Sequence, residues 1–176
     1  MIVYLVRHAN AGKSLATKRL DEARPLDEKG VEQARLMGRM LSALGEQAEV
    51  VLSSPLKRAS QTASLVANEL GYDGKIVPVK ALRPDATYAG FRQLLEEYAG
   101  KEAIMVVGHN PSLKAFLSLL VTGDDRTDAV EMKKGAVAKV DVGERICKLL
   151  WYVTPAIAAA AYANTGTRSR PKSARK

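Results

Sequence analysis

The sequence begins with MIVYLVRHAN (residues 1–10), in which a run of apolar side chains ends at Arg7 and His8. Continuous apolar runs that contain β-branched and aromatic residues are typical of buried strands. We therefore predict a buried strand over Met1–Val6, with an arginine and a histidine at its carboxyl end. The chain has only two histidines, so a histidine at this position is a candidate for chemistry.

Strand-like and helix-like segments alternate along the rest of the chain. Five more strands are predicted, at EVVLSS (49–54), KIVPVKAL (75–82), EAIMVVGH (102–109), GAVAKVDV (135–142) and ICKLLWYV (146–153). Helices are predicted from Asp27 as N-cap to Gly45, from Ser54-Pro55 to Gly71, and over 88–98, 111–121 and 155–163, with a polar loop over Asn10–Pro25. This alternation predicts an α/β fold of three layers, α/β/α, around a mostly parallel sheet with an antiparallel edge.

Composition limits the class of protein to which the chain belongs. Its 176 residues are 47% hydrophobic, which suits one domain with a real core, and we place that domain at residues 1–163. The single cysteine, Cys147, excludes an internal disulfide and favours a reducing, cytoplasmic location; we interpret it as inert packing. No apolar stretch is long enough to span a bilayer and no signal peptide is recognisable, so no membrane association is expected. No group of side chains has metal-ligand spacing, and we expect neither a metal nor another cofactor.

The net charge of +8 is unevenly distributed along the chain. Residues 164–176 (NTGTRSRPKSARK) carry five basic side chains and no acid, which leaves 22 basic and 19 acidic residues in the body. The tail is polar and lacks aromatic residues, so we predict that it is disordered. Its charge suits either a solubilising tail or contact with nucleic acid or an acidic partner. Since the body is nearly balanced in charge, we do not expect nucleic acid as the main partner.

Both histidines of the chain fall at the same end of the predicted sheet. His8 follows the first strand and His109 follows EAIMVVG, while Ser53-Ser54-Pro55 follows the second strand with Arg58 in the first turn of the next helix. Ligands of mostly parallel sheets bind beyond these carboxyl ends of the strands. Guanidinium groups, imidazoles and helix N-termini together suit a phosphoryl group, and a neutral imidazole can attack phosphorus to form a covalent intermediate.

Other polar residues near the predicted site have two interpretations each. Asn10 either donates to a phosphate or forms the turn after the strand. Arg24 either reaches the pocket from its loop or pairs with Asp21 or Asp27. Arg58 is either a solvated helix residue or, because it lies in the first turn of its helix, an arginine of the pocket. As an exposed pocket arginine it is expected to contribute little to folding.

Three segments resemble the motifs of the histidine phosphatase superfamily, also called phosphoglycerate mutase-like. They are VRHAN (6–10), SSPLKRASQTA (53–63) and VVGHNP (106–111), and the resemblance extends from Met1 to about Pro155. It implies the phosphoglycerate mutase-like fold, with His8 as the phosphoryl-accepting nucleophile and Arg7, Arg58 and His109 completing the phosphate pocket. Ala9 replaces the glycine that this family usually has after its histidine.

A catalytic glutamate of the family's phosphomonoesterases and mutases has no clear counterpart in the chain. The corresponding stretch is ALRPDATYAG (81–90), in which Pro84 stands where the glutamate is expected and Asp85 follows it. The compact SixA-like branch of phosphohistidine phosphatases also tends to lack this acid and the subdomain that covers the site. The segments RPLDEKG (24–30) and LLWYVTP (149–155) resemble that branch as well.

Three functions therefore remain under consideration. The first is a phosphohistidine phosphatase that acts on a phosphotransfer protein. The second is a small-molecule phosphomonoesterase or mutase, with Asp85 or His109 as proton donor. The third is a non-catalytic phosphoprotein-binding module. An alkoxide leaving group needs a general acid, whereas imidazole leaves readily once its ring is protonated, so the missing glutamate favours the first function.

Overall fold

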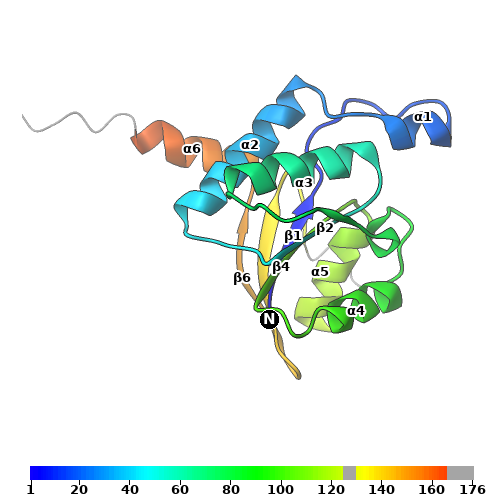
Figure 1. Cartoon of the computed structure of the whole chain (residues 1–176), viewed down its shortest axis with the longest axis vertical. Helices are drawn as coiled ribbons and strands as arrows, with labels where there is room; N and C mark the ends of the chain where they lie inside the picture. The colour runs from blue at the N-terminus through cyan, green and yellow to red at the C-terminus, as the bar shows by residue number, and fades with distance from the viewer. Residues whose placement is uncertain (125–129, 166–176) are drawn as a thin grey trace, which may run out of the picture.

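A six-stranded sheet forms the centre of the computed structural model, which describes residues 1–124 and 130–165 (Figure 1). The strands are β1 (Ile2–Arg7), β2 (Val50–Ser53), β3 (Val77–Pro78), β4 (Ala103–Gly108), β5 (Val137–Val142) and β6 (Cys147–Val153). Their order is β3-β2-β4-β1-β5-β6, in which β1 to β4 are parallel and the β5–β6 pair is antiparallel. The predicted mostly parallel sheet with an antiparallel edge is confirmed.

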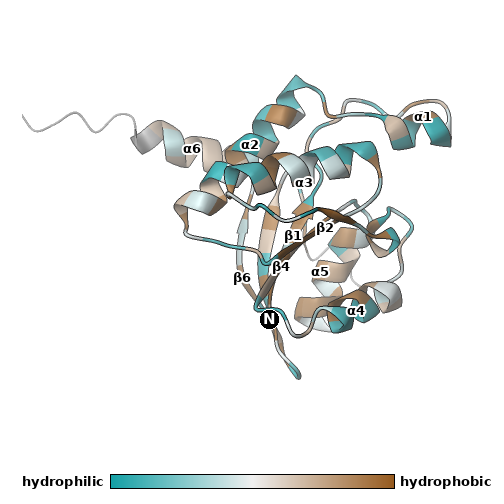
Figure 2. Cartoon of the chain, viewed as in Figure 1, coloured by the Kyte–Doolittle hydropathy of each residue, from teal (hydrophilic) through white to brown (hydrophobic). Residues whose placement is uncertain are grey.

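Two hydrophobic cores lie on the two faces of this sheet. Tyr4 and Val6 of β1 face one core, which α2 (Glu28–Ala43), α3 (Lys57–Glu69) and α6 (Pro155–Thr165) cover. Val3 and Leu5 face the other core, which α4 (Tyr88–Glu97) and α5 (Ser112–Thr122) cover. Side chains alternate between the faces of a strand, so a strand covered on both sides must be apolar throughout. Figure 2 shows this apolar character along the central strands, in contrast to the mixed colouring of the helices.

The register of the strands brings the candidate residues to one end of the sheet. Arg7 pairs with Gly108 across β1 and β4, and Ser53 of β2 pairs with Val107. His8 and His109 therefore follow directly from neighbouring parallel strands, and Ser54 follows from the strand beside them. The prediction that these segments meet at the carboxyl edge is confirmed.

Several predicted boundaries were wrong, for local physical reasons. The segment predicted as a loop over Asn10–Pro25 contains a short helix, α1 (Lys18–Ala23), which buries no residue and so leaves no apolar stripe in the sequence. Helix α3 begins at Lys57, after Leu56 as N-cap, rather than at Ser54-Pro55; the Ser54 hydroxyl contacts the His109 ring instead of capping the helix. KIVPVKAL divides into β3 and a 3₁₀ turn, η1 (Lys80–Leu82).

The carboxyl-terminal part of the chain is only partly described. Helix α6 continues to Thr165, two residues beyond the predicted end, and the rest of the predicted basic tail lies outside the described residues. Within residues 1–124 and 130–165, no helix combines the length and the hydropathy needed to cross a membrane.

The first turn of α2 packs tightly against the loop that follows His8. Asp27 caps this helix, as predicted, by accepting a hydrogen bond from the Gly30 backbone N–H at 2.8 Å. The Asp27 backbone N–H in turn donates to the carbonyl oxygen of Asn10 at 3.2 Å. Helix α2 therefore fixes the path of the chain just beyond the candidate nucleophile.

We expect Gly30→Ala to destabilise the protein. A Cβ atom at this position would lie 1.9 Å from the carbonyl oxygen of Asn10, a backbone atom. Overpacking typically costs about 1–3 kcal/mol, which exceeds the gain of about 1 kcal/mol that alanine has over glycine in a helix. Urea unfolding measures the loss. Gly100→Ala is the control, because a Cβ there meets no atom within 4 Å; equal stability of the two variants would contradict the tight packing of α2.

Candidate active site

The backbone around His8 is held from both sides of β1. Its N–H donates to the carbonyl oxygen of Gly108 at 3.0 Å, and its own carbonyl oxygen accepts from the Gly135 N–H at 3.1 Å. The ring is 7% exposed, and its Nδ1 lies 2.7 Å from the carbonyl oxygen of Ala9. A carbonyl only accepts hydrogen bonds, so Nδ1 carries the proton and the lone pair resides on Nε2.

Burial keeps the His8 ring neutral. Desolvation lowers the pKa of His8 from 6.5 to about 3; the bond to Ala9 opposes this shift, while the charges of Arg58, Arg7 and Lys134 add to it. At neutral pH the imidazole therefore has an unprotonated nitrogen. That is the form of histidine that can act as a nucleophile.

The second histidine, His109, lies against the first. The two ring centroids are 4.9 Å apart, and Nε2 of His109 is 2.8 Å from the hydroxyl oxygen of Ser54. Its Nδ1 is buried and has no hydrogen-bond partner. Burial, followed by the neighbouring His8 and Arg58, lowers the pKa of His109 to about 2.

Arg58 is buried rather than exposed as the sequence analysis expected. Only 5% of its surface is accessible, because α1 covers it. Its Nη1 donates to the carbonyl oxygen of Asp21 at 2.8 Å and lies 3.3 Å from the Asp21 carboxylate. Its Nε is buried without a partner. Desolvation by burial lowers the pKa of this guanidinium, and the Asp21 carboxylate compensates part of that cost.

Arg7 presents a similar unpaired nitrogen. Its Nη1 donates to the carbonyl oxygen of Met132 at 2.6 Å, while its Nε is buried and unpaired. Three buried nitrogen atoms in the described residues, on Arg7, Arg58 and His109, thus lack a partner in the immediate surroundings of His8. An unsatisfied buried donor typically costs about 1–3 kcal/mol. A tetrahedral oxyanion beside His8 could accept from several of these nitrogens at once.

Asn10 and Arg24 are both engaged with protein atoms. The Asn10 amide donates to the Asp27 carboxylate at 2.6 Å and accepts from Lys134 Nζ at 2.8 Å. Arg24 Nε lies 2.9 Å from the Asp21 carboxylate, one of the two pairings that the sequence left open. Direct binding of a phosphate by either residue remains a prediction.

Sequence reasoning missed two residues that hold the candidate site together. Asp21 is predicted only as an alternative partner of Arg24, whereas in the structure it also holds Arg58. Ser54 is predicted to begin a helix, whereas its hydroxyl is bonded to His109. The motif SSPLKRASQTA (53–63) places Ser54 at a strand end, which is a signal that it belongs to the site. No signal in the sequence connects Asp21 with Arg58, because the two residues are 37 positions apart.

Asp85 lies near the site but faces solvent. Its side chain is 70% exposed and lies 3.6 Å from Arg83 Nε. Arg58, Pro84 and Asp85 line one cavity of about 190 Å³. No group of three or more histidine, cysteine or carboxylate side chains within the described ranges could hold a metal ion.

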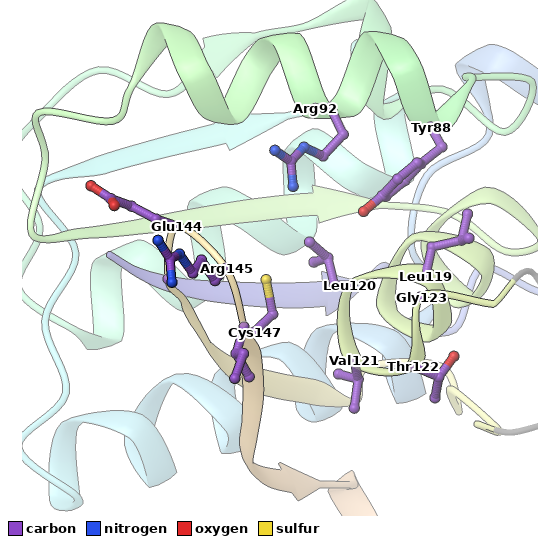
Figure 3. A pocket seen from close by; sticks show the side chains of 12 residues that line it. Tyr88, Arg92, Leu119, Leu120, Val121, Thr122, Gly123, Glu144, Arg145 and Cys147 are labelled. Atoms are coloured by element: carbon purple, nitrogen blue, oxygen red, sulfur yellow. The ribbon is translucent and has the colours of Figure 1, made fainter.

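A larger groove, of about 390 Å³, is separate from the histidines (Figure 3). It lies between α4, α5 and the β5–β6 turn, and Arg92, Arg145 and Cys147 are among the residues that line it. Cys147 is partly buried and packs against the second core, which agrees with its interpretation as a packing residue. None of the predicted site residues lines this groove.

Comparisons with known proteins place the chain among phosphatases. The model of the histidine phosphatase superfamily (branch 1) matches residues 3–83. An uncharacterized protein of Picosynechococcus sp. is 35% identical over 130 residues, which cover 70% of this chain and 74% of that protein. The phosphohistidine phosphatase SixA of Escherichia coli is 30% identical over 131 residues, 70% of this chain and 76% of SixA.

A solved structure supports the same relationship. The protein histidine phosphatase SixA in complex with tungstate matches this fold with a TM-score of 0.79 and 26% sequence identity. The match covers 89% of this chain and 98% of that one. Both the architecture and the sequence similarity therefore extend well beyond the three short motifs.

We expect the stability of the protein to fall as the pH drops below about 6.5. The pKa values of His8 and His109 are lowered in the folded state, so the unfolded chain binds more protons at mildly acidic pH. The contribution is complete above the unfolded pKa of about 6.5, and each histidine can remove up to about 1.4 kcal/mol of unfolding free energy per pH unit below it.

Urea unfolding of the wild type, His8→Gln and His109→Gln between about pH 5 and pH 7 measures this effect. Each substitution removes one titrating ring, so each variant should show a shallower dependence on pH. Identical slopes in all three proteins would contradict the burial of neutral histidines.

Proposed function

Because the chain belongs to the histidine phosphatase superfamily, we propose that this phosphatase hydrolyses phosphohistidine in a protein substrate through a covalent intermediate on His8. The similarity to the phosphohistidine phosphatase SixA over 76% of its length supports this substrate class. The expected protein partner is a phosphotransfer protein that carries a phosphorylated histidine. The single cysteine favours a reducing, cytoplasmic compartment for the reaction.

The observation that carries the proposal is the arrangement of nitrogen atoms around His8. The 2.7 Å contact between Nδ1 and the Ala9 carbonyl oxygen leaves the lone pair on Nε2. The His109 ring centroid lies 4.9 Å from that of His8, and the charges of Arg58 and Arg7 act on His8. Each of these three side chains has a buried nitrogen without a partner. A nucleophilic nitrogen beside two guanidinium groups and a second imidazole suits the transfer of a phosphoryl group.

In the proposed first step the His8 Nε2 lone pair forms a bond to phosphorus. The bond between phosphorus and the substrate's ring nitrogen breaks, and its electron pair stays on that nitrogen. If the other nitrogen of the substrate ring already carries a proton, the leaving group is neutral imidazole. Phosphoryl transfer then occurs between two equivalent rings and needs no general acid.

In the proposed second step a water oxygen attacks the same phosphorus. The bond to His8 Nε2 breaks, its electron pair returns to Nε2, and inorganic phosphate leaves after water has lost a proton to solvent. Throughout both steps the proton stays on Nδ1, which donates a hydrogen bond to the Ala9 carbonyl oxygen. That hydrogen bond stabilises the positive charge that the ring carries while it is phosphorylated.

The surroundings of Pro84 support an imidazole leaving group. Proline supplies no proton at the position where the related esterases have a glutamate, and Asp85 is 70% exposed beside Arg83. This carboxyl group faces solvent and the Arg83 guanidinium rather than a buried site. It is therefore poorly suited to protonate an alkoxide.

A small-molecule phosphomonoesterase remains the alternative, and one observation favours it. Asp85 lines the same 190 Å³ cavity as Arg58, so a small ester bound at Arg58 would lie close to this carboxyl group. In that case Asp85, or His109, would supply the proton. A non-catalytic binding module is less consistent with a nucleophilic nitrogen that is kept neutral by burial.

We expect phosphoramidates to be cleaved far better than alkyl phosphate esters. General acid catalysis typically contributes about 10²–10⁴-fold, so its absence should produce a preference of at least about 10²-fold in kcat/KM. The measurement compares a phosphohistidine peptide with a phosphoserine peptide of the same sequence and with glycerol phosphate. Asp85→Asn should leave the phosphohistidine rate unchanged, and Pro84→Glu should raise the ester rate.

The alternative predicts a different pattern in the same assay. If phosphoserine and glycerol phosphate were hydrolysed as efficiently as phosphohistidine, and Asp85→Asn abolished only the ester activity, Asp85 would be the general acid. The chain would then be a phosphomonoesterase. Loss of all activities in Asp85→Asn would point to a structural role for this residue and would require a check of folding.

A further inference from the structure

A further cavity is lined by Arg7 but not by Arg58. It has a volume of about 430 Å³, and we call it the lysine pocket because Arg7, Lys29, Lys133 and Lys134 line it with Glu131. The lining of this pocket therefore contains four basic side chains and one acidic side chain. The excess of positive charge is local, because the body of the chain is nearly balanced.

Neighbouring elements add to this positive character. Lys29 lies in the first turn of α2, and the residues that begin α6, Thr154 to Ala156, line the same cavity. Thr154 caps α6 by accepting from the Ile157 N–H at 3.3 Å. The N-terminal ends of helices carry positive partial charge, so α2 and α6, which lie side by side in Figure 1, both favour an anion here.

Lys134 connects the pocket with the candidate active site. Its Nζ donates to the Asn10 amide oxygen at 2.8 Å, just beyond His8. Burial and then repulsion from Arg7, Arg24 and Lys29 lower the pKa of Lys134. The same lysine is among the charges that lower the pKa of His8. The cations of the pocket are thus close enough to one another and to the nucleophile to act on one bound molecule.

In the described part of the chain (1–124 and 130–165), few carboxylates compensate the charges of Lys29, Lys133 and Lys134. Lys133 has Glu131 at 3.3 Å, but both side chains are about two-thirds exposed, so the pair contributes little. Lys134 is bonded to a neutral amide. The Asp27 carboxylate also acts on Lys134, so two carboxylates accompany the cations of the pocket. The remaining excess of positive charge raises the local concentration of anions and favours an anionic ligand.

We propose that the lysine pocket binds a second anionic group of the substrate, a carboxylate of an acidic residue beside the phosphorylated histidine. The inference rests on the proposed function, and it names the feature by which the enzyme selects among phosphohistidine proteins. Arg7 lies at the boundary, so the phosphoryl group and the carboxylate bind on its two sides. Substrates with acidic flanking residues are therefore preferred over those with neutral ones.

The test compares two peptides that differ only in charge. Both carry a stable phosphonate analogue of phosphohistidine; one has aspartates on both sides of it and the other has asparagines. Calorimetry measures binding to the full chain at low ionic strength, where screening is weak. The wild type should bind the aspartate peptide about tenfold more tightly, the effect expected of one charge-assisted contact.

Matched variants test whether the lysine pocket produces the preference for the aspartate peptide. Lys29→Gln and Lys134→Gln should each reduce the tenfold ratio severalfold, while the affinity for the asparagine peptide changes much less. Lys75→Gln is the control, because this exposed lysine precedes β3 at the opposite edge of the sheet. It should leave the ratio unaltered.

The possible failures are distinguishable. Equal binding of both peptides by the wild type, or a ratio that survives in the Lys29→Gln/Lys134→Gln double variant, would overturn the lysine pocket and leave the proposed function intact. Binding of neither peptide would contradict the proposed function and the inference that rests on it. A ratio lost equally in Lys75→Gln would show that only the overall charge matters, which would also overturn the proposal.

Discussion

Burial of nitrogen-rich side chains at the carboxyl edge of the sheet is the constraint on which the site depends. Removing His8, His109 and Arg58 from water disfavours their charged forms, so both rings are neutral and Arg58 needs the Asp21 carboxylate. Several buried donors still lack partners. Such a site suits the proposed oxyanion, because the burial that keeps His8 neutral also leaves buried nitrogens that a phosphate would pair.

The parallel sheet supplies the rigidity that this arrangement needs. Because β1, β4 and β2 are adjacent and in register, the backbone alone fixes the separation of His8, His109 and Ser54. Connecting segments complete the site: helix α1 brings Asp21 to Arg58, and the segment before β5 brings Lys134 to Asn10. A fixed nucleophile with surrounding loops allows substrate preference to change without disturbing the proposed chemistry.

The sequence predicted the strands, the sheet class and the ends where polar residues meet, because continuous apolar runs and strand-end motifs are local signals. It did not predict α1, since a six-residue helix without a buried face leaves no periodicity. The role of Ser54 and the pairing of Asp21 with Arg58 also escaped prediction, because both depend on contacts between distant segments. The burial of Arg58 was missed for the same reason. The sequence of its own helix does not show that a distant segment, α1, covers this side chain.

The central claim is that His8, neutral and oriented by Ala9, accepts the phosphoryl group. The most direct measurement is intact mass spectrometry at neutral or alkaline pH after brief mixing of the enzyme with a phosphohistidine substrate. The account predicts an acid-labile increase of one phosphoryl group in the wild type that maps to His8 and is absent from His8→Gln. A protein that turns over the substrate without forming this adduct, or a His8→Gln variant with activity near that of the wild type, would contradict it.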